Sequence, residues 1–311
     1  MNIALAFDKT YTAPFFAAVA SIIENNKTES ISFHVIASGL TTIEHQEIEK
    51  FILDSKAKIK FYTIDEDNIK KLFIHKDSHF SSPAIFYRLF FAHLIPQDIE
   101  KILYVDVDTI ILKSLHELFA IDMQAFPVAA VKDAWPYDHS SLGISEEDGY
   151  FNSGVLLINT EEWRKQKIVE RTLEFISNHE RLLSMPDQDA LNSILVGNWL
   201  KLDKKYNLQF NYIPNPVNKF ELNKLIAQTV IVHYTTASKP WIRGCVNRMR
   251  DLYFYYIDKT PYRDKPRFFN TQSSGAGFYR ASVVYIKEYY TDSEWLMHIW
   301  RSVKKTVNVF K

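Results

Sequence analysis

The sequence has little cysteine, no long apolar run and no excess of charge of either sign. Cys245 is the single cysteine among 311 residues, which rules out an intramolecular disulfide and predicts a reducing compartment such as the cytoplasm. Lysine and arginine (37) balance aspartate and glutamate (37), so no nucleic-acid partner is expected. No apolar run reaches the length of a membrane span, and the segment before Asp8 lacks the basic lead-in of a signal peptide. A soluble or peripheral protein is predicted.

The first half of the chain alternates short apolar runs with segments of helical periodicity. This alternation predicts an α/β fold with a parallel sheet covered by helices on both faces. Such sheets bind ligands beyond the carboxyl ends of their strands, where four acidic residues stand: Asp8, Asp106, Asp108 and Asp133. The predicted strands are 2–7, 32–37, 59–64, 101–105 and 127–131, and the predicted helices are 11–25, 41–55 and 84–94.

The second half is less regular. A loop entering a strand is predicted over 150–159, helices over 160–178 and 187–196, a loop over 206–218, and a late strand over 231–234. Proline, serine and glycine over 262–277 indicate a linker, which divides the chain into a catalytic domain (1–260) and an appendage (261–311).

The predicted appendage ends in a basic amphipathic helix over 291–311. Thr291 and Glu294 fit a capping box at its start. Apolar residues recur at helical spacing, and the segment after Glu294 has no acidic residue. One interpretation is a helix that docks its apolar stripe on the core; the other is attachment to an anionic membrane surface. The uniform positive charge favours the membrane.

Asp106 and Asp108 flank Val107 directly after the predicted strand KILYV. In extended backbone, residues two apart point to the same side, so both carboxylates face one ligand. Paired carboxylates suit Mg²⁺ or Mn²⁺, and such a cation can bridge two phosphates. The alternative interpretation is a pair that caps a loop or a helix.

Two further residues can complete such a site. His233 lies in the predicted strand IVHY, and an imidazole beside two carboxylates suits Mn²⁺. The alternative is a buried, hydrogen-bonded histidine. Lys239 follows in a loop rich in hydroxyl groups, a composition that binds phosphate oxygens. The alternative is a solvated surface charge, but Pro240 and Trp241 favour a fixed loop.

Other polar residues have simpler explanations. Asp187 and Asp189 open a predicted helix, where the helix dipole favours acidic side chains, but this does not explain Gln188 between them. Asn152 fits a turn before a strand, and Arg88 fits an ordinary helix surface.

Taken in order, six segments resemble the family 8 retaining glycosyltransferases of the GT-A fold. The similarity is greatest to the bacterial lipooligosaccharide and lipopolysaccharide galactosyl- and glucosyltransferases. The joint order of the segments is far more specific than any one of them. They span roughly residues 1–250: ALAFDKTY, FYRL, ILYVDVDTII, YFNSGVLLIN, PDQDALN and HYTTASKPW.

The resemblance implies a GT-A, Rossmann-like domain with a mostly parallel sheet that binds a nucleotide sugar. It also implies a role for each matching residue. Asp106, Asp108 and His233 match the manganese ligands, and Gln188 and Asp187 match the catalytic centre beside the transferred sugar. The implied donor contacts are Ala6, Asp8, Thr10, Tyr11, Arg88, Asp106, Val107, Asn152, Ser153, Asp187, Gln188, Thr236 and Lys239.

The implied reaction moves galactose or glucose from a UDP-sugar to a saccharide acceptor and retains the anomeric configuration. The implied acceptor is a lipid-linked oligosaccharide at the cytoplasmic face of a bacterial inner membrane. The implied cofactor is Mn²⁺ or Mg²⁺. Thr10 and Thr236 depart from the pattern, because close relatives carry Asn and Gly there. Gln188 is either a nucleophile or a neutral neighbour of front-face attack, and the low nucleophilicity of an amide favours the latter.

Two other functions are compatible with parts of the sequence. A sugar-1-phosphate nucleotidyltransferase also uses an α/β sheet and acidic metal ligands, but it needs a glycine-rich loop after the first strand, and FDKTYTAP has no glycine. A non-catalytic or self-glycosylating nucleotide-sugar-binding protein is the other alternative. The presence of two aspartates and a histidine together argues against a site without activity.

Overall fold

Within the part of the chain that the structure describes, ten strands form two sheets, and helices pack around them. The structure is a computed structural model. It describes residues 1–65, 82–135, 138–179, 182–214 and 217–268, together with 282, 283, 286, 288–293, 295, 296, 298 and 299.

The larger sheet has seven strands in the order β3-β2-β1-β4-β7-β6-β8. Pairing is parallel from β3 to β4 and between β6 and β8, and antiparallel on both sides of β7. The mostly parallel sheet is therefore confirmed, with β7 as the reversed strand. Its strands are β1 (Asn2–Asp8), β2 (Ser32–Ser38), β3 (Lys58–Tyr62), β4 (Lys101–Val105), β6 (Val128–Lys132), β7 (Phe151–Asn159) and β8 (Leu200–Lys201).

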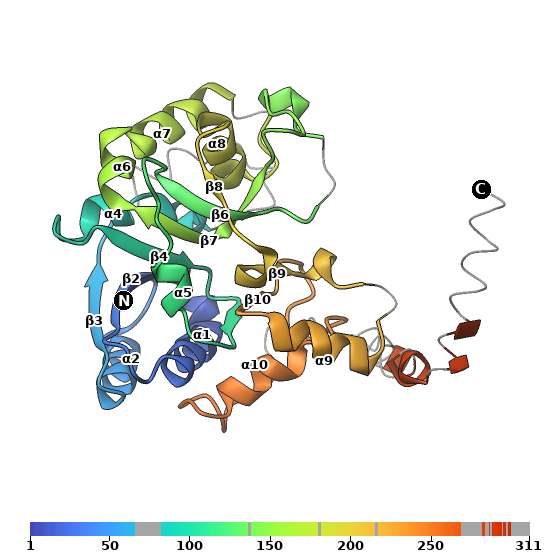
Figure 1. Ribbon diagram of the computed structural model, residues 1–311. Coiled ribbons are helices and arrows are strands. Elements are labelled where there is room, and N and C mark those ends of the chain that lie inside the picture. The colour runs from blue at the N-terminus through green and yellow to red at the C-terminus, as the bar shows by residue number, and fades with distance from the viewer. Residues whose placement is uncertain are drawn as a thin grey trace.

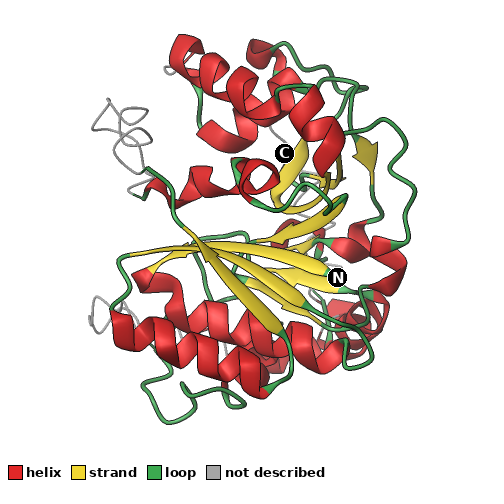
Figure 2. Cartoon of the chain, turned by 90° about the vertical axis from the view of Figure 1, so that its left-hand side faces the viewer, coloured by secondary structure: helices red, strands yellow, loops and turns green. Residues whose placement is uncertain are grey.

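Helices cover both faces of this sheet (Figures 1 and 2). Side chains alternate along β1, so Leu5 packs into one apolar core with α1, and Ala4 into a second core with α4 and α6. Helix α2 begins with a capping box between Thr41 and Glu44. The covering helices are α1 (Thr12–Asn25) and α2 (Thr42–Asp54) on one side, and α4 (Phe91–Leu94), α6 (Thr160–Lys165), α7 (Ile168–His179) and α8 (Pro186–Ile194) on the other.

The smaller sheet has three strands, β5 (Thr109–Ile111), β10 (Ile231–His233) and β9 (Leu208–Gln209). The last residue of β10 pairs with the first of β5, His233 with Thr109. Asn25 at the end of α1 donates to Ile111 O at 3.0 Å, so the two sheets are fixed to each other. Short helices surround this part: α5 (His116–Phe119), α9 (Lys219–Gln228) and α10 (Arg250–Ile257).

Two predicted helices take a different form. The segment over 84–94 is a 3-10 helix, Pro83–Leu89, followed by the single turn of α4. The segment over 160–178 is two helices, because Lys167 adopts a positive φ of 52° between α6 and α7. The loop predicted over 206–218 contains β9, which is too short to leave a periodic pattern.

The predicted C-terminal helix is described only in part. Glu294 and residues 300–311 lie outside the described residues, so the capping box and the basic end of the helix lie there too. Thr291 is not a helix start: it lies in a helical stretch over 288–292, and its hydroxyl donates to Glu288 O at 2.9 Å. Among the described residues, no helix combines the length and apolarity that crossing a bilayer requires.

Candidate active site

Asp106 and Asp108 lie where β4 leaves the sheet and turns into β5. The amide N–H of Asp106 donates to Gly154 O of the neighbouring β7 at 2.8 Å, which fixes the backbone there. The Oδ1 atom of Asp106 accepts from the hydroxyl of Tyr104 at 2.5 Å. The backbone oxygen of Asp108 accepts from Tyr234 N of the segment that carries His233. Both carboxylates are therefore held at the end of a buried strand, as predicted.

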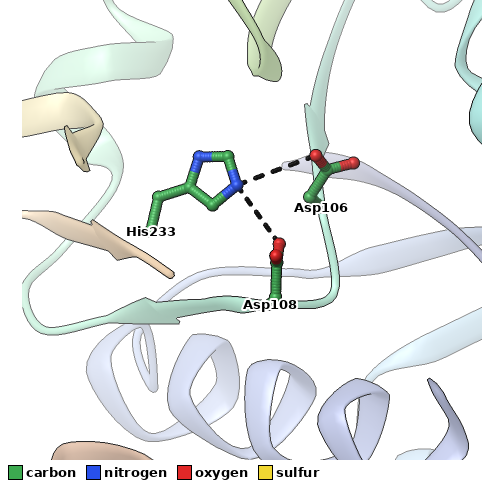
Figure 3. A group of neighbouring side chains, drawn as sticks. All are labelled: Asp106, Asp108 and His233. Atoms are coloured by element: carbon green, nitrogen blue, oxygen red, sulfur yellow. Dashed lines mark ion pairs between the residues drawn. The ribbon is translucent and has the colours of Figure 1, made fainter. Parts of the chain in front are cut away.

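His233 brings its imidazole to these carboxylates from the smaller sheet (Figure 3). Its Nε2 atom lies 3.2 Å from Asp108 Oδ1 and 3.8 Å from Asp106 Oδ2. One ligand atom from each residue lies within 4.8 Å of the other two, which suits a single cation. A Cβ at Gly154 would lie 2.2 Å from His233 Cε1 and 2.5 Å from Asp106 Oδ2. The glycine therefore leaves room for His233 and Asp106, and the three residues present fit Mn²⁺ or Mg²⁺.

Arg88 is a buried cation that contacts both Asp106 and Asp187. Its guanidinium lies 3.0 Å from Asp106 Oδ1 and 3.1 Å from Asp187 Oδ2, and it donates to Ser153 O at 2.7 Å. Burial raises the pKa of the Asp187 carboxyl, and the charge of Arg88 offsets part of that rise. The surface role considered for Arg88 is excluded, because its side chain is 9% exposed.

Lys239 supplies a second cation, beside Asp108. Its Nζ atom lies 2.5 Å from Asp108 Oδ2 and also donates to Tyr234 O. Burial acts to raise the pKa of Asp108, but Lys239 and His233 lower that pKa below its usual range. Asp108 is therefore ionised and available to a cation at neutral pH. The lysine belongs to the site and is not a solvated surface charge.

A cavity of about 490 Å³ opens beside these groups. Asp8 lines the cavity, and its Oδ1 atom accepts from Thr10 N at 2.9 Å. Burial, together with the charges of Asp108 and Asp8, raises the pKa of Tyr11 to about 12, so its phenol stays protonated. The cavity is lined by seven of the thirteen predicted donor contacts and by the predicted metal ligand Asp108; the seven are Ala6, Asp8, Thr10, Tyr11, Arg88, Asp106 and Val107.

Gln188 lies next to a second cavity of about 320 Å³, at the start of α8. Its Oε1 atom accepts from Ser153 N at 2.8 Å and from Asn152 Nδ2 at 3.2 Å, and its Nε2 donates to Asp133 Oδ2 at 3.2 Å. Three predicted residues, Asn152, Ser153 and Gln188, thus form one buried network. Thr236 lies apart from it and lines neither cavity, and its hydroxyl accepts from Ser238 N.

Three residues of the site were absent from the predictions. Tyr104 orients Asp106, and the guanidinium of Arg88 lies 5.0 Å from the centre of its ring. Asn207 contacts His233, and the absence of a side chain at Gly154 makes room for the imidazole of His233. Tyr104 carried a usable signal, because it precedes Asp106 by two residues and shares its face of the strand.

Comparison with known proteins agrees with this geometry. Residues 2–245 match the model of glycosyl transferase family 8. The chain is 30% identical to general stress protein A of Bacillus subtilis, over 84% of this chain and 94% of that protein. It is 27% identical to lipopolysaccharide 1,2-glucosyltransferase of Escherichia coli K12, over 85% and 79%. The crystal structure of the galactosyltransferase LgtC superposes with a TM-score of 0.74, at 23% identity, over 85% and 99%.

The fold and the site define a glycosyltransferase of the GT-A type. The chain belongs to glycosyltransferase family 8. The GT-A fold expected from the sequence is therefore confirmed, and the nucleotidyltransferase alternative is excluded by family membership.

Proposed function

We propose that this transferase moves galactose or glucose from a UDP-sugar to a saccharide of the cell surface and retains the anomeric configuration. The observation that carries the proposal is the joint position of Asp106, Asp108 and His233, because the two aspartates also line the larger cavity. Arg88 supplies positive charge beside Asp106, and Lys239 supplies it beside Asp108. The similarity to a lipopolysaccharide glucosyltransferase supports a hexose donor and a glycan acceptor.

Asp106, Asp108 and His233 would hold Mn²⁺ or Mg²⁺. When bound, the cation neutralises charge on the donor diphosphate and stabilises the departing UDP. Two basic side chains, Lys239 and Arg88, would assist the cation. Lys239 is within reach of the same oxygens, and Arg88 holds Asp187 beside the place for the sugar.

The hydrogen bonds of Gln188 support front-face attack. Its Oε1 atom accepts hydrogen bonds from Ser153 and Asn152, so the electron pairs that a nucleophile needs are engaged. We infer that the bond between the anomeric carbon and the phosphate oxygen breaks first. The acceptor hydroxyl then attacks the same face, and its proton passes to the departing phosphate. Gln188 and Asp187 stabilise the positive charge that develops on the sugar.

Substitution of Gln188 separates the two routes. Gln188→Ala should slow transfer roughly 100-fold without abolishing it, because a dipole beside the sugar is lost and no covalent step is removed. Steady-state kinetics measures the loss, and intact-mass analysis during turnover tests for a glycosylated enzyme. A covalent sugar on Gln188 would overturn the front-face route.

A donor screen tests the reaction. With Mn²⁺ present, UDP-galactose or UDP-glucose should be hydrolysed faster than UDP-N-acetylglucosamine, and a chelator should abolish hydrolysis. Asp108→Asn keeps the side-chain size but removes a ligand charge, and it should reduce turnover at least 100-fold. Full activity in chelator, or in Asp108→Asn, would contradict the metal-dependent proposal.

The second cavity, beside Gln188, is the proposed place of the acceptor. Asp133, His139 and Tyr150 line it, and acidic and aromatic groups together suit a saccharide. A saccharide that serves as acceptor should slow amide hydrogen exchange over 138–142 and 184–189. Protection that appears only elsewhere in the chain would place the acceptor in another site.

We propose that the C-terminal segment attaches the enzyme to the cytoplasmic face of a membrane. Large apolar side chains in this segment are exposed, and the sequence after it carries Arg301, Lys304, Lys305 and Lys311. The exposed fractions are 43% for Val283, 58% for Ile286, 76% for Tyr289, 53% for Tyr290, 72% for Trp295 and 43% for Ile299.

Flotation with vesicles tests this attachment. The full chain should float with vesicles that contain anionic lipid and remain behind with neutral vesicles. Tyr289→Ser together with Trp295→Ser should release it, and donor hydrolysis should be unchanged. Phe220→Ser removes an exposed aromatic ring (78% exposed) from α9 and serves as the control. Equal flotation of the double variant and the full chain would refute the membrane role.

A further inference from the structure

The ring nitrogen of His233 that faces away from the carboxylates has a buried partner. His233 Nδ1 lies 3.0 Å from the side-chain oxygen of Asn207. Asn207 is fully buried, and it directly precedes β9, the strand that pairs in parallel with β10. An acceptor at this position requires the proton of a neutral imidazole to be on Nδ1, which leaves the lone pair on Nε2.

The orientation of the Asn207 amide follows from its other contacts. Its Nδ2 atom lies 2.9 Å from Asn152 Oδ1, which also lies 3.1 Å from the amide nitrogen of Gly154. A backbone N–H only donates, so this atom of Asn152 is an oxygen, and Asn207 must present its NH₂ group to it. The NH₂ group of Asn152 lies 3.0 Å from Asp133 Oδ2, a carboxylate oxygen that accepts.

We propose that Asn207 is a positioning residue that fixes the tautomer of His233. Asn152 donates to Asp133 through its NH₂ group, and Asn207 donates to Asn152 through its own. The side-chain oxygen of Asn207 is therefore the atom that accepts from His233. Nδ1 thereby keeps its proton, and Nε2, the nitrogen that faces the two carboxylates, is the one left to bind a cation. This inference rests on the proposed metal-dependent function, and it adds a residue outside the set of ligands and donor contacts.

The same contacts explain why an asparagine suits position 207. A leucine has a similar volume but would leave His233 Nδ1–H without an acceptor in a buried place, which favours the opposite tautomer. An aspartate would still accept from His233, although its second oxygen would face Asn152 Oδ1. Asn207→Leu therefore removes both the oxygen that accepts from His233 and the NH₂ group that donates to Asn152, whereas Asn207→Asp removes only the NH₂ group.

Nitrogen-15 NMR of metal-free protein tests the tautomer directly. In protein labelled at histidine, the signals of His233 are identified by their absence in His233→Gln. In the unsubstituted chain, Nδ1 should give the signal of a protonated ring nitrogen. In Asn207→Leu the proton should leave Nδ1 in a substantial fraction of molecules, and in Asn207→Asp it should remain there. An unprotonated Nδ1 in the unsubstituted chain would overturn the inference.

Binding of Mn²⁺, followed by electron paramagnetic resonance, tests the consequence. Asn207→Leu should weaken binding roughly 10- to 100-fold, as the loss of a partner behind a metal ligand does, and Asn207→Asp should restore binding to within a few-fold. Asn26→Leu is the matched control. It removes a buried amide that bonds Ile22 O and Leu115 N at the end of α1, and Mn²⁺ affinity should not change.

The outcomes separate this inference from the proposed function. Absence of Mn²⁺ binding to the unsubstituted chain would overturn the metal-dependent function. Normal Mn²⁺ binding by a folded Asn207→Leu chain would overturn only the role of Asn207. The NMR measurement on the unsubstituted chain decides the tautomer even where a variant does not fold.

Discussion

At the scale of single residues, Gly154 cannot accept a side chain unless its neighbours move. Its backbone does not require glycine, since its φ is not positive, so the constraint is one of space. Tyr104 and Arg88 hold Asp106, and Asn207 holds His233, so neither side chain can move away from an added methyl group. The close approach of β7 to the site therefore depends on this one residue.

Gly154→Ala should reduce Mn²⁺ affinity at least tenfold and slow transfer roughly 100-fold, because the added Cβ displaces two metal ligands. Titration of Mn²⁺ and steady-state kinetics measure both effects, and circular dichroism checks that the fold is kept. A folded Gly154→Ala chain with ordinary Mn²⁺ affinity would show that the site tolerates the displacement.

His34 makes stability depend on pH away from the active site. Burial, with a contribution from Lys60, lowers the pKa of His34 to about 4 from an ordinary value of 6.5. Between these values the unfolded chain binds a proton that the folded chain does not, so stability falls as pH decreases from 6.5 to 4.

We expect His34 to account for about 1–2 kcal/mol of the unfolding free energy lost over this range. Urea unfolding at several pH values measures the loss, and His34→Gln should flatten the curve. His116, whose side chain is 72% exposed, is the control: His116→Gln should leave the slope as it was. A slope in His34→Gln equal to that of the unsubstituted chain would assign the loss to other groups.

Residues at strand ends were predictable, and their supporting contacts were not. Asp8, Asp106 and Asp108 follow strands, and the rule that such sheets bind ligands at the carboxyl ends of their strands places them together. Asn207 follows a short 3-10 helix, and its importance comes from a partner that lies beside it only after β9 and β10 pair. No local pattern reports such a partner.

At the scale of elements, ion pairs join the C-terminal segment to the catalytic body. Asp292 accepts from Lys219 N at the start of α9 (2.9 Å) and from Arg248 Nη2 (2.7 Å). Glu288 accepts two hydrogen bonds from the guanidinium of Arg250, at 2.6 and 2.8 Å. Arg248 lies just before α10 and Arg250 is its first residue, so the segment is tied to the beginning of α10.

Glu288→Gln with Asp292→Asn removes both charges and keeps side-chain size. Paired charge-assisted hydrogen bonds of this kind contribute about 1.5–3 kcal/mol each, so amide exchange over 288–293 should rise at least tenfold. Mass-spectrometric hydrogen exchange measures this rise. Lys50→Gln breaks an exposed pair with Asp54 on α2 and should leave the segment as it was. Unchanged exchange in the double variant would mean that apolar contacts hold the segment.

Long, periodic elements were predicted well and short ones were not. The strand predicted over 101–105 is β4, and the strands predicted over 2–7 and 32–37 end one residue early. Strands of two or three residues, such as β9 and β5, carry no periodicity, and tertiary pairing defines them. The antiparallel direction of β7 could not be predicted, because a fully buried strand has the same run of apolar residues in a parallel or an antiparallel pairing.

At the scale of the whole molecule, the proposed metal ligands come from two sheets. Asp106 follows β4 of the larger sheet and His233 ends β10 of the smaller one, so a cation bound there would link the two sheets. The class of fold was predictable from the alternation of strands and helices. The second sheet was not, since its three strands come from distant parts of the chain. The predicted division into 1–260 and 261–311 stays a prediction.

Metal should stabilise the folded chain. At a free Mn²⁺ concentration about 100 times the Kd, binding contributes about 2.7 kcal/mol, which corresponds to a Tm increase of roughly 3–5 °C for a chain of this size. Differential scanning fluorimetry with Mn²⁺ and with chelator measures the increase. Asp108→Asn should lose most of it, and an equal increase in that variant would place the stabilising metal elsewhere.

The pairing of β10 with β5 also sets the order in which the enzyme is completed during synthesis. Asp106 and Asp108 leave the ribosome long before His233 and Lys239 do, yet all four meet in one site. All seven described strands of the larger sheet precede β10 in the chain, so this sheet can begin to form while translation continues. A nascent chain that stops before β10 therefore lacks the nucleotide-sugar site, however well its first half has folded.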